Sequence, residues 1–188
     1  SEVRCLDLSV TTISGTDTWL AGCGNFSQGK VLRSVNASTW TQTLGTDPLD
    51  VDAMGRTAVA IRGNRAYAIS TSLVPGFDRS GSVGGDYQNQ LHAFFRSDDG
   101  GAHWLSLPSP YNGSFFGLLP LGGDSLLVFG LRGNLFRTDD AGASWRKVES
   151  GSTAMLTDGI AVDDRRLDRA VVARPVLSHH DLRALPAP

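Results

Sequence analysis

A pattern that recurs after 41 residues constrains the fold of this 188-residue chain more than any other feature. The segment RSDDGGAHW, residues 96–104, returns 41 positions later as RTDDAGASW, residues 137–145. A looser copy, RSVNASTW, covers residues 33–40. In each copy an apolar run leads to Arg, then to Ser or Thr, a polar turn, and a Trp that opens a second alternating run. A repeat of this length with turn residues inside each unit is typical of propellers and solenoids.

Short apolar runs bounded by Gly, Asn or Asp indicate that each unit is built from strands. Such runs occur at residues 17–23, 65–70 and 125–130, and another candidate strand precedes each of them. Every unit therefore fits four antiparallel strands of about 5 or 6 residues. We predict an all-β fold, a β-propeller or partial propeller in which each four-stranded sheet is one blade and the repeated turn is a hairpin.

The expected blade boundaries follow from the repeat. Propeller blades are expected within residues 1–175, at about 6–46, 51–108 and 112–149 with a partial blade at 152–175, and a divergent tail at 176–188. Complete propellers have about 4 to 8 blades. The chain is therefore a fragment of a longer ring, half of an assembly closed by a second copy, or an open stack with its edge strand covered by the tail.

A long insertion rich in Gly, Ser and Asp, residues 74–89, interrupts the second unit. It accounts for the 64 residues between Trp40 and Trp104, against 41 between Trp104 and Trp145. Connections of this length are either binding loops or disordered segments. The insertion is therefore one candidate for a functional surface.

The residue types of the repeated turn have local structural roles. In the second unit Asp99 can accept backbone N–H groups across the turn, Gly101 can adopt a positive φ, and Trp104 can pack a large ring between sheets. Ser97 supplies a hydroxyl at the start of the turn. The same roles recur in register at Thr138, Asp140, Gly142 and Trp145.

This turn resembles the Asp-box, or bacterial neuraminidase repeat, S/T-x-D-x-G-x-x-W. The motif occurs in sialidases, sortilin-type receptors, some glycoside hydrolases and the photosystem II assembly-factor family of propellers. Two copies match fully; the first has Asn36 for Asp, Ser38 for Gly and one residue fewer before Trp40. The resemblance implies a hairpin between the third and fourth strands of a blade, remote from any catalytic centre. The box is therefore expected to be structural.

Residues 16–45 and 123–148, and more loosely 64–107, resemble the assembly-factor branch, where a short strand ending in Gly precedes G-x-L-x-R-S/T and the box. The resemblance implies a non-enzymatic propeller, periplasmic or secreted, that binds another protein and assists assembly or stability of a membrane-associated complex. A shared fold does not carry the partner with it. The alternative is a carbohydrate-active propeller, a sialidase-like glycoside hydrolase or a lectin.

The residues needed for sialidase chemistry are scarce. That resemblance requires three Arg around a carboxylate, a Tyr nucleophile with its Glu, and an acid/base Asp. The chain has two Glu, Glu2 and Glu149, and three Tyr, and it lacks the early Arg-Ile-Pro signature. We therefore expect no enzymatic activity.

Composition and motifs indicate few other functions. A net charge of -2 does not favour a nucleic-acid binder, and no apolar run is long enough for membrane insertion. Metal-ligand residue types cluster only at His179, His180 and Asp181, where adjacent His side chains rarely converge on one ion. No phosphate-binding loop follows a strand, so we expect neither a metal nor a cofactor.

One Arg precedes the Ser or Thr of every box, at Arg33, Arg96 and Arg137. Blade symmetry places these residues at equivalent positions, and three guanidinium groups in a row would suit an anionic surface on a partner protein. Arg132 could join them. The alternative is a scaffold role, in which each Arg caps or pairs with its own box Asp, or a simply solvated side chain.

Cys5 and Cys23 lie on the first two candidate strands. They form a disulfide in an oxidising compartment or remain buried thiols in a reducing one. Pairing through the turn at residues 14–17 places Cys5 nearer Phe26, so a disulfide requires a slip or a bulge.

Overall fold

The computed structural model describes residues 4–25, 27–74, 90–111, 113–161 and the backbone of 170–173. The chain divides into two compact units, residues 1–114 and 115–188, and each is described by itself. The insertion beyond Val74 and the tail at 176–188, including His179, His180 and Asp181, lie outside the described residues.

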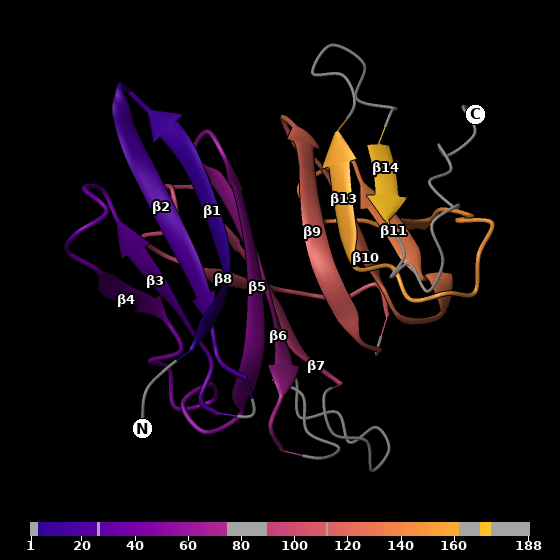
Figure 1. The fold of residues 1–188 in the computed structure, drawn as a ribbon, viewed down its shortest axis with the longest axis horizontal. Coiled ribbons are helices and arrows are strands. Elements are labelled where there is room, and N and C mark those ends of the chain that lie inside the picture. Colours follow the sequence, from indigo (N-terminus) through magenta and orange to yellow (C-terminus); the bar gives the residue numbers. More distant parts are fainter. Residues whose placement is uncertain (1–3, 26, 75–89, 112, 162–169, 174–188) are drawn as a thin grey trace. The chain divides into compact units, whose positions relative to one another are not determined.

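The first unit contains two antiparallel meanders of four strands (Figure 1). In each sheet every strand pairs with the strand that precedes it in sequence. The first sheet comprises β1 (Cys5–Ile13), β2 (Thr16–Cys23), β3 (Lys30–Ser34) and β4 (Thr41–Leu44). The second comprises β5 (Met54–Arg62), β6 (Arg65–Ser72), β7 (Leu91–Ser97) and β8 (Leu105–Leu107).

The second unit contains a third four-stranded meander and a two-stranded sheet. The meander comprises β9 (Phe115–Gly122), β10 (Ser125–Gly130), β11 (Leu135–Thr138) and β12 (Arg146–Lys147), with the short helix η1 (Leu131–Gly133) between β10 and β11. The two-stranded sheet comprises β13 (Asp158–Ala161) and β14 (Ala170–Ala173). The predicted all-β architecture of four-stranded antiparallel blades, consistent with a partial propeller, is confirmed.

The two sheets of the first unit pack face to face. Leu20 and Val31 of the first sheet meet Val59, Ile61 and other residues of the second in one buried cluster. Burying apolar area contributes roughly 25 cal/mol per Å², so this layer is the main stabilising feature of the unit.

Glycine brings the two backbones close together at one end of this layer. Gly29 donates its N–H to the carbonyl oxygen of Met54 at 2.7 Å. A Cβ at Gly22 would overlap the carbonyl oxygen of Thr57, and one at Gly29 that of Gly55. These two glycines are therefore required by the approach of the sheets.

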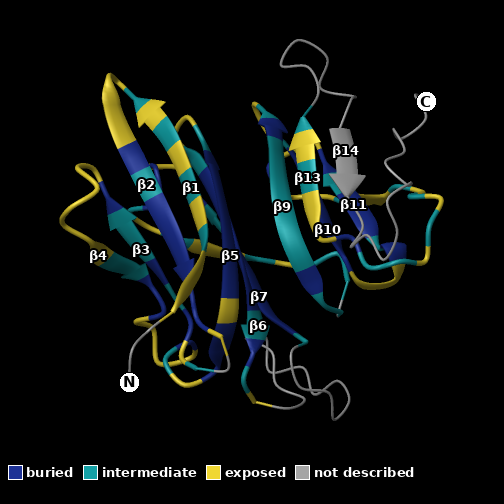
Figure 2. Cartoon of the chain, in the orientation of Figure 1, coloured by how far each residue is buried: buried dark blue, intermediate teal, exposed yellow. Residues whose placement is uncertain are grey.

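Strand β1 half-buries its polar face and exposes its apolar face (Figure 2). Asp7 and Ser9 accept the backbone N–H groups of Val59 (2.8 Å) and Ile61 (3.1 Å) in β5, and Thr11 accepts that of Gly63 (3.0 Å) in the turn after β5. The alternate residues on the opposite face are apolar and exposed: Leu6 (52%), Leu8 (58%) and Val10 (48%).

The core of the second unit is a cluster of Leu121, Leu127, Phe129, Leu135 and Leu156. Leu119, Val148 and Ala161 pack against it. Ala161 comes from β13, so the two-stranded sheet covers one side of the third sheet.

Candidate functional site

The box of the second sheet is held by its Ser and Asp side chains. Ser97 Oγ donates to Asp99 Oδ1 at 2.8 Å and accepts the N–H of Gly101 at 2.8 Å. Asp99 Oδ1 also accepts the N–H groups of Ala102 (3.0 Å) and His103 (2.9 Å), while Asp99 Oδ2 lies 2.6 Å from His103 Nδ1. Gly101 has φ of +85°. The polar groups of the motif are thus used within the turn.

Trp104 connects this box to the first sheet. Its ring packs against the cluster between the two sheets, and its indole N–H donates to Thr43 Oγ1 at 3.2 Å. The residue acts as a packing element between neighbouring blades.

The third sheet repeats the geometry of the second. Thr138 Oγ1 donates to Asp140 Oδ1 at 2.7 Å and accepts the N–H of Gly142 at 2.8 Å. Asp140 also accepts the N–H and the hydroxyl of Ser144, at 2.8 and 2.5 Å. Gly142 has φ of +90°.

The first copy forms the same turn despite its altered sequence. Asn36 Oδ1 accepts the N–H groups of Ser38 (3.0 Å) and Thr39 (2.8 Å) and the hydroxyl of Ser34 (3.1 Å). An amide oxygen can therefore replace the carboxylate oxygen, because the turn requires an acceptor rather than a charge.

The box carboxylates are held in the ionised form. Burial raises the pKa of Asp99, but hydrogen bonds from the backbone and ring of His103, with those from Ser97 and Ala102, outweigh it and hold the pKa well below its ordinary value. The hydroxyl and N–H of Ser144, with the Thr138 hydroxyl, lower the pKa of Asp140 to about 2. A general acid at neutral pH requires a raised pKa, so these carboxylates do not suit that role.

The Arg that precedes each intact box pairs with the carboxylate beside the box Asp. Arg96 Nε lies 3.2 Å from Asp98 Oδ1, and Arg65 Nε reaches the same oxygen at 3.0 Å. Arg137 Nη2 lies 2.7 Å from Asp139 Oδ1 and lowers the pKa of that carboxyl. Both Arg side chains are mostly covered, with exposures of 21% and 17%.

Arg33 has a different partner because its own box lacks that carboxylate. Val35 occupies the position of Asp98, and Arg33 Nε instead donates to the carbonyl oxygen of Gly100 in the second box at 2.9 Å. Arg96 and Arg137 pair with carboxylates of their own boxes, as in the scaffold alternative, whereas Arg33 contacts the neighbouring box.

Arg132 differs from the other three cationic candidates. It lies in η1, is exposed, and has left-handed backbone angles, φ 58° and ψ 34°. Among the residues that the structure describes, its guanidinium has no hydrogen-bond or ion-pair partner. Non-Gly residues in this conformation cost about 1–2 kcal/mol and are often found at functional sites.

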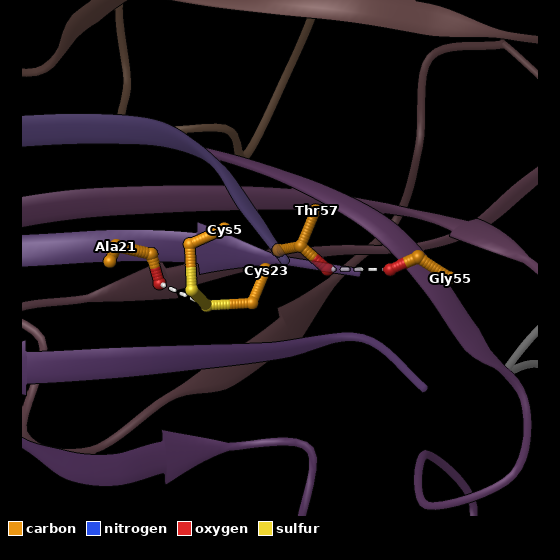
Figure 3. The surroundings of a disulfide bond; sticks show 5 residues. All are labelled: Cys5, Ala21, Cys23, Gly55 and Thr57. Atoms are coloured by element: carbon orange, nitrogen blue, oxygen red, sulfur yellow. Dashed lines mark hydrogen bonds between the residues drawn. A yellow bond between two sulfur atoms is a disulfide. The ribbon is translucent and has the colours of Figure 1, made fainter. Parts of the chain in front are cut away.

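A disulfide of 2.05 Å joins Cys5 of β1 to Cys23 of β2 (Figure 3). The register through residues 14–17 that placed Cys5 nearer Phe26 is wrong, because the turn is the two-residue Ser14–Gly15 and Ile13 pairs with Thr16. The observed register, continued without a bulge, would place Cys5 opposite Gly24. A bulge between Cys5 and Asp7 then moves Cys5 opposite Cys23, so the expected irregularity is present.

Sequence analysis missed one buried polar pair. His92 Nε2 of β7 lies 2.9 Å from Asp50 Oδ1 in the β4–β5 connection, and both side chains are buried, at 0% and 1% exposure. The residues are 42 positions apart, so no local motif links them. Because solvent does not reach the pair, its role is to hold the connection against β7.

Tyrosine and metal-ligand residues are the remaining candidates for chemistry in the described part of the chain. Tyr67 is buried at 1% exposure. Across the described ranges no three His, Cys, Asp or Glu residues group as metal ligands. In the same ranges, no helix has the length and apolar character needed to cross a membrane.

Comparison with known proteins gives structural matches alone. No family model and no curated protein matches the chain. A structure of YCF48 bound to a D1 peptide matches with a TM-score of 0.57 and 15% identity, covering 93% of this chain and 54% of that chain. YCF48 from Cyanidioschyzon merolae matches with a TM-score of 0.59 and 15% identity, covering 91% and 53%. These matches show a fold that is consistent with a partial β-propeller.

The chain spans about half the length of these YCF48 chains. A Trypanosoma rangeli sialidase mutant with trans-sialidase activity also matches, with a TM-score of 0.36 and 11% identity, covering 88% of this chain and 42% of that chain. At these identities the YCF48 matches show the fold, and the sialidase match carries no argument about activity.

Proposed function

We propose that this chain is a non-enzymatic partial β-propeller, periplasmic or secreted, that binds a segment of another protein. Its wider role would be to assist assembly or stability of a membrane-associated complex. The partner is defined here only as a segment of another protein.

The observation that carries the proposal is the use of the box polar groups within their own turns. Asp99 and Asp140 accept several turn hydrogen bonds each and have lowered pKa values. Carboxylates held this way stabilise a scaffold and leave its outer surfaces to bind. A protein-binding role needs no catalytic group.

The neighbouring solved structure supports the same direction. YCF48 has been solved bound to a D1 peptide, and its fold covers 93% of this chain. Peptide capture is thus compatible with this arrangement of sheets. We transfer to this chain the type of ligand, a protein segment, and not the D1 peptide itself.

Arg132 is the residue that we propose to contact the partner. Its exposed guanidinium and left-handed backbone place a cation in the β10–β11 connection. Arg forms paired hydrogen bonds with carboxylates, so the favoured ligand is a segment with Asp or Glu. We assign Arg33, Arg96 and Arg137 to the support of the boxes and not to the partner contact.

The test is selection from a random-sequence peptide display library, followed by fluorescence anisotropy titration of the selected peptides. We expect acidic peptides that bind with 1:1 saturation. Arg132→Gln should weaken binding by about two- to fivefold, the range of an exposed ion pair, and reduce its salt dependence. Arg4→Gln is the matched control because Arg4 is also exposed.

Two results would contradict the proposal. One is hydrolysis of a fluorogenic sialoside by the purified chain, together with loss of that activity in a heat-denatured sample. The other is a chain that binds members of a glycan array and selects no peptide.

A further inference from the structure

The first box departs from the Asp-box motif at three points, and two of them together create a different motif. Asn36 stands in the place of the box Asp and Ser38 in the place of the box Gly, so residues 36–38 read Asn-Ala-Ser. Asn-x-Ser/Thr, with x other than Pro, is the acceptor sequence for N-linked glycans. The third departure is the loss of one residue before Trp40.

The shorter turn explains why a serine can replace the box glycine. In the intact boxes Gly101 and Gly142 have φ of +85° and +90°, a region that favours glycine. Ser38 does not have a positive φ, and within residues 34–40 only Ala37 does, with 58°. The position of the box glycine is therefore open to a residue with a side chain.

The turn uses one polar atom of the Asn36 side chain and leaves the other available. Asn36 Oδ1 accepts the hydroxyl of Ser34 and the N–H groups of Ser38 and Thr39. Within the described part of the chain, Asn36 Nδ2 donates no hydrogen bond and the Ser38 hydroxyl makes none, and both side chains are exposed. N-glycosylation requires these two groups, an amide nitrogen that receives the sugar and a hydroxyl two residues later.

The acceptor position stays exposed when a box packs against a preceding sheet. The second box shows this, because the ring of Trp104 packs against the cluster between the two sheets of the first unit. Asp99 corresponds to Asn36, and 45% of its side chain is exposed. Asp140 of the third box is also exposed. A glycan at this position would therefore extend into solvent and not into the layer between sheets.

Transfer of a glycan preserves the hydrogen bonds of the turn. Asn36 Nδ2 forms a bond to the anomeric carbon of a lipid-linked oligosaccharide, the bond from that carbon to the pyrophosphate of the carrier breaks, and Nδ2 gives one proton to a base of the transferase. Oδ1 takes no part in the new bond and keeps its three hydrogen bonds. The carboxylates of Asp99 and Asp140 have no nitrogen that could receive the sugar.

We propose that Asn36 is an N-glycosylation site, modified in a secretory compartment that supplies lipid-linked oligosaccharide. The Cys5–Cys23 disulfide fits the same compartment, because disulfides form and persist in oxidising environments. This inference goes beyond the proposed function: it shares the secreted location and does not depend on peptide binding. Residues 25–27 and 112–114 have the same sequence pattern, but each includes a residue outside the described ranges.

The first experiment separates Asn36 from the other two patterns. The 188-residue chain with Asn25→Gln and Asn112→Gln is translated behind a cleavable secretion signal in a cell-free system with rough microsomes. We expect a slower electrophoretic band that peptide-N-glycosidase removes. Ser38→Thr should keep this band, whereas Asn36→Asp and Ser38→Ala should lose it. Thr39→Ala is the matched control and should keep the band, because Thr39 is exposed in the same turn and its hydroxyl is not part of the motif.

Asn36→Asp also separates loss of the acceptor nitrogen from loss of the turn. The variant keeps a side-chain oxygen as acceptor, as Asp99 and Asp140 do. Its urea midpoint at neutral pH should not fall below that of the unglycosylated parent. A lost band with a retained midpoint therefore reports on the acceptor nitrogen and not on folding.

The second experiment uses the chain isolated from the cells that produce it. Peptide-N-glycosidase in heavy-oxygen water converts a glycosylated Asn to a labelled Asp, and trypsin releases residues 34–56, in which Asn36 is the single Asn. We expect the label at this residue. An unlabelled Asn36 would overturn the inference, whether or not Asn25 or Asn112 is modified. A microsomal band that survives Asn36→Asp in the two-site variant would overturn it as well.

Discussion

At the residue scale, the three boxes show which property of the motif is essential. Asp99, Asp140 and Asn36 each accept two or more hydrogen bonds from the turn. The acceptor oxygen is common to all three, whereas the charge is absent from the first. The carboxylate therefore adds a pH-dependent contribution to a turn that an amide can also hold.

We expect Asp99→Ala to lower the free energy of unfolding by about 1 kcal/mol or more, because it leaves turn N–H groups without their acceptor. Urea unfolding followed by circular dichroism measures the change. Asp52→Ala, at an exposed position, should change stability by less than about 0.5 kcal/mol. Equal midpoints for Asp99→Ala and the parent protein would contradict the structural role of the box.

Asp140 should make stability depend on acid pH. Its pKa is lowered to about 2 in the folded chain, against about 3.9 in an unfolded one. Its contribution is therefore full above about pH 4 and is lost as the pH falls toward 2. In Asp140→Asn the amide keeps the acceptor, as Asn36 does, but cannot titrate.

Urea midpoints measured from pH 7 to pH 2 test this prediction. Between pH 4 and pH 2 the parent should lose more stability than Asp140→Asn does. Asp52→Asn should follow the parent. If the urea midpoints of the parent and Asp140→Asn fall equally between pH 4 and pH 2, ionisation of Asp140 does not contribute to stability.

At the scale of elements, the β1–β2 hairpin is constrained at both of its ends. A two-residue turn closes one end and the Cys5–Cys23 disulfide closes the other, next to a bulge. Three side chains of the hairpin also accept hydrogen bonds from the backbone of β5 and the turn after it. Its polar face is thus fixed within the unit, and its apolar face with Leu6, Leu8 and Val10 is exposed.

We expect intact mass measurement to show no free thiol in the protein purified from an oxidising compartment. Opening the disulfide should lower stability by about 3 kcal/mol, since it closes a loop of 18 residues. A Cys5→Ser, Cys23→Ala double variant should unfold at the same urea concentration with and without dithiothreitol. Two free thiols in the non-reduced parent would contradict both the bond and the proposed export.

At the scale of the whole molecule, the chain consists of two compact units with separate cores. In the first unit the first sheet packs against β5, and in the second unit the third sheet packs against one face of β13. In the first unit Leu8 and Val10 of β1 are exposed, and in the second unit Ile160 of β13 is exposed.

The two units should respond differently to reductant. Trp19, Trp40 and Trp104 lie in the first unit, and Trp145 lies in the second, so Trp145→Phe makes fluorescence report on the first unit alone. Dithiothreitol should lower the fluorescence midpoint of this variant in urea more than the circular dichroism midpoint. Coincident midpoints under both conditions would show that the units unfold as one.

The sequence was sufficient to predict features that arise from local chemistry. The spacing of the boxes predicted four-stranded antiparallel sheets, since each box supplies its own acceptor and Trp, and the two intact boxes also supply a glycine. It also predicted an irregularity near Cys5 if the two cysteines were to meet. These features depend on residues within one hairpin, so the chain order alone contains them.

Features that depend on contacts between hairpins required the tertiary structure. Alternation along β1 shows that Leu6, Leu8 and Val10 share a face, but not that this face is exposed while Asp7 and Ser9 meet β5. The partner of Arg33 and the Asp50–His92 pair are equally absent from any local pattern. Periodicity determines which side chains lie together, whereas the neighbouring sheet determines which of the two faces is covered.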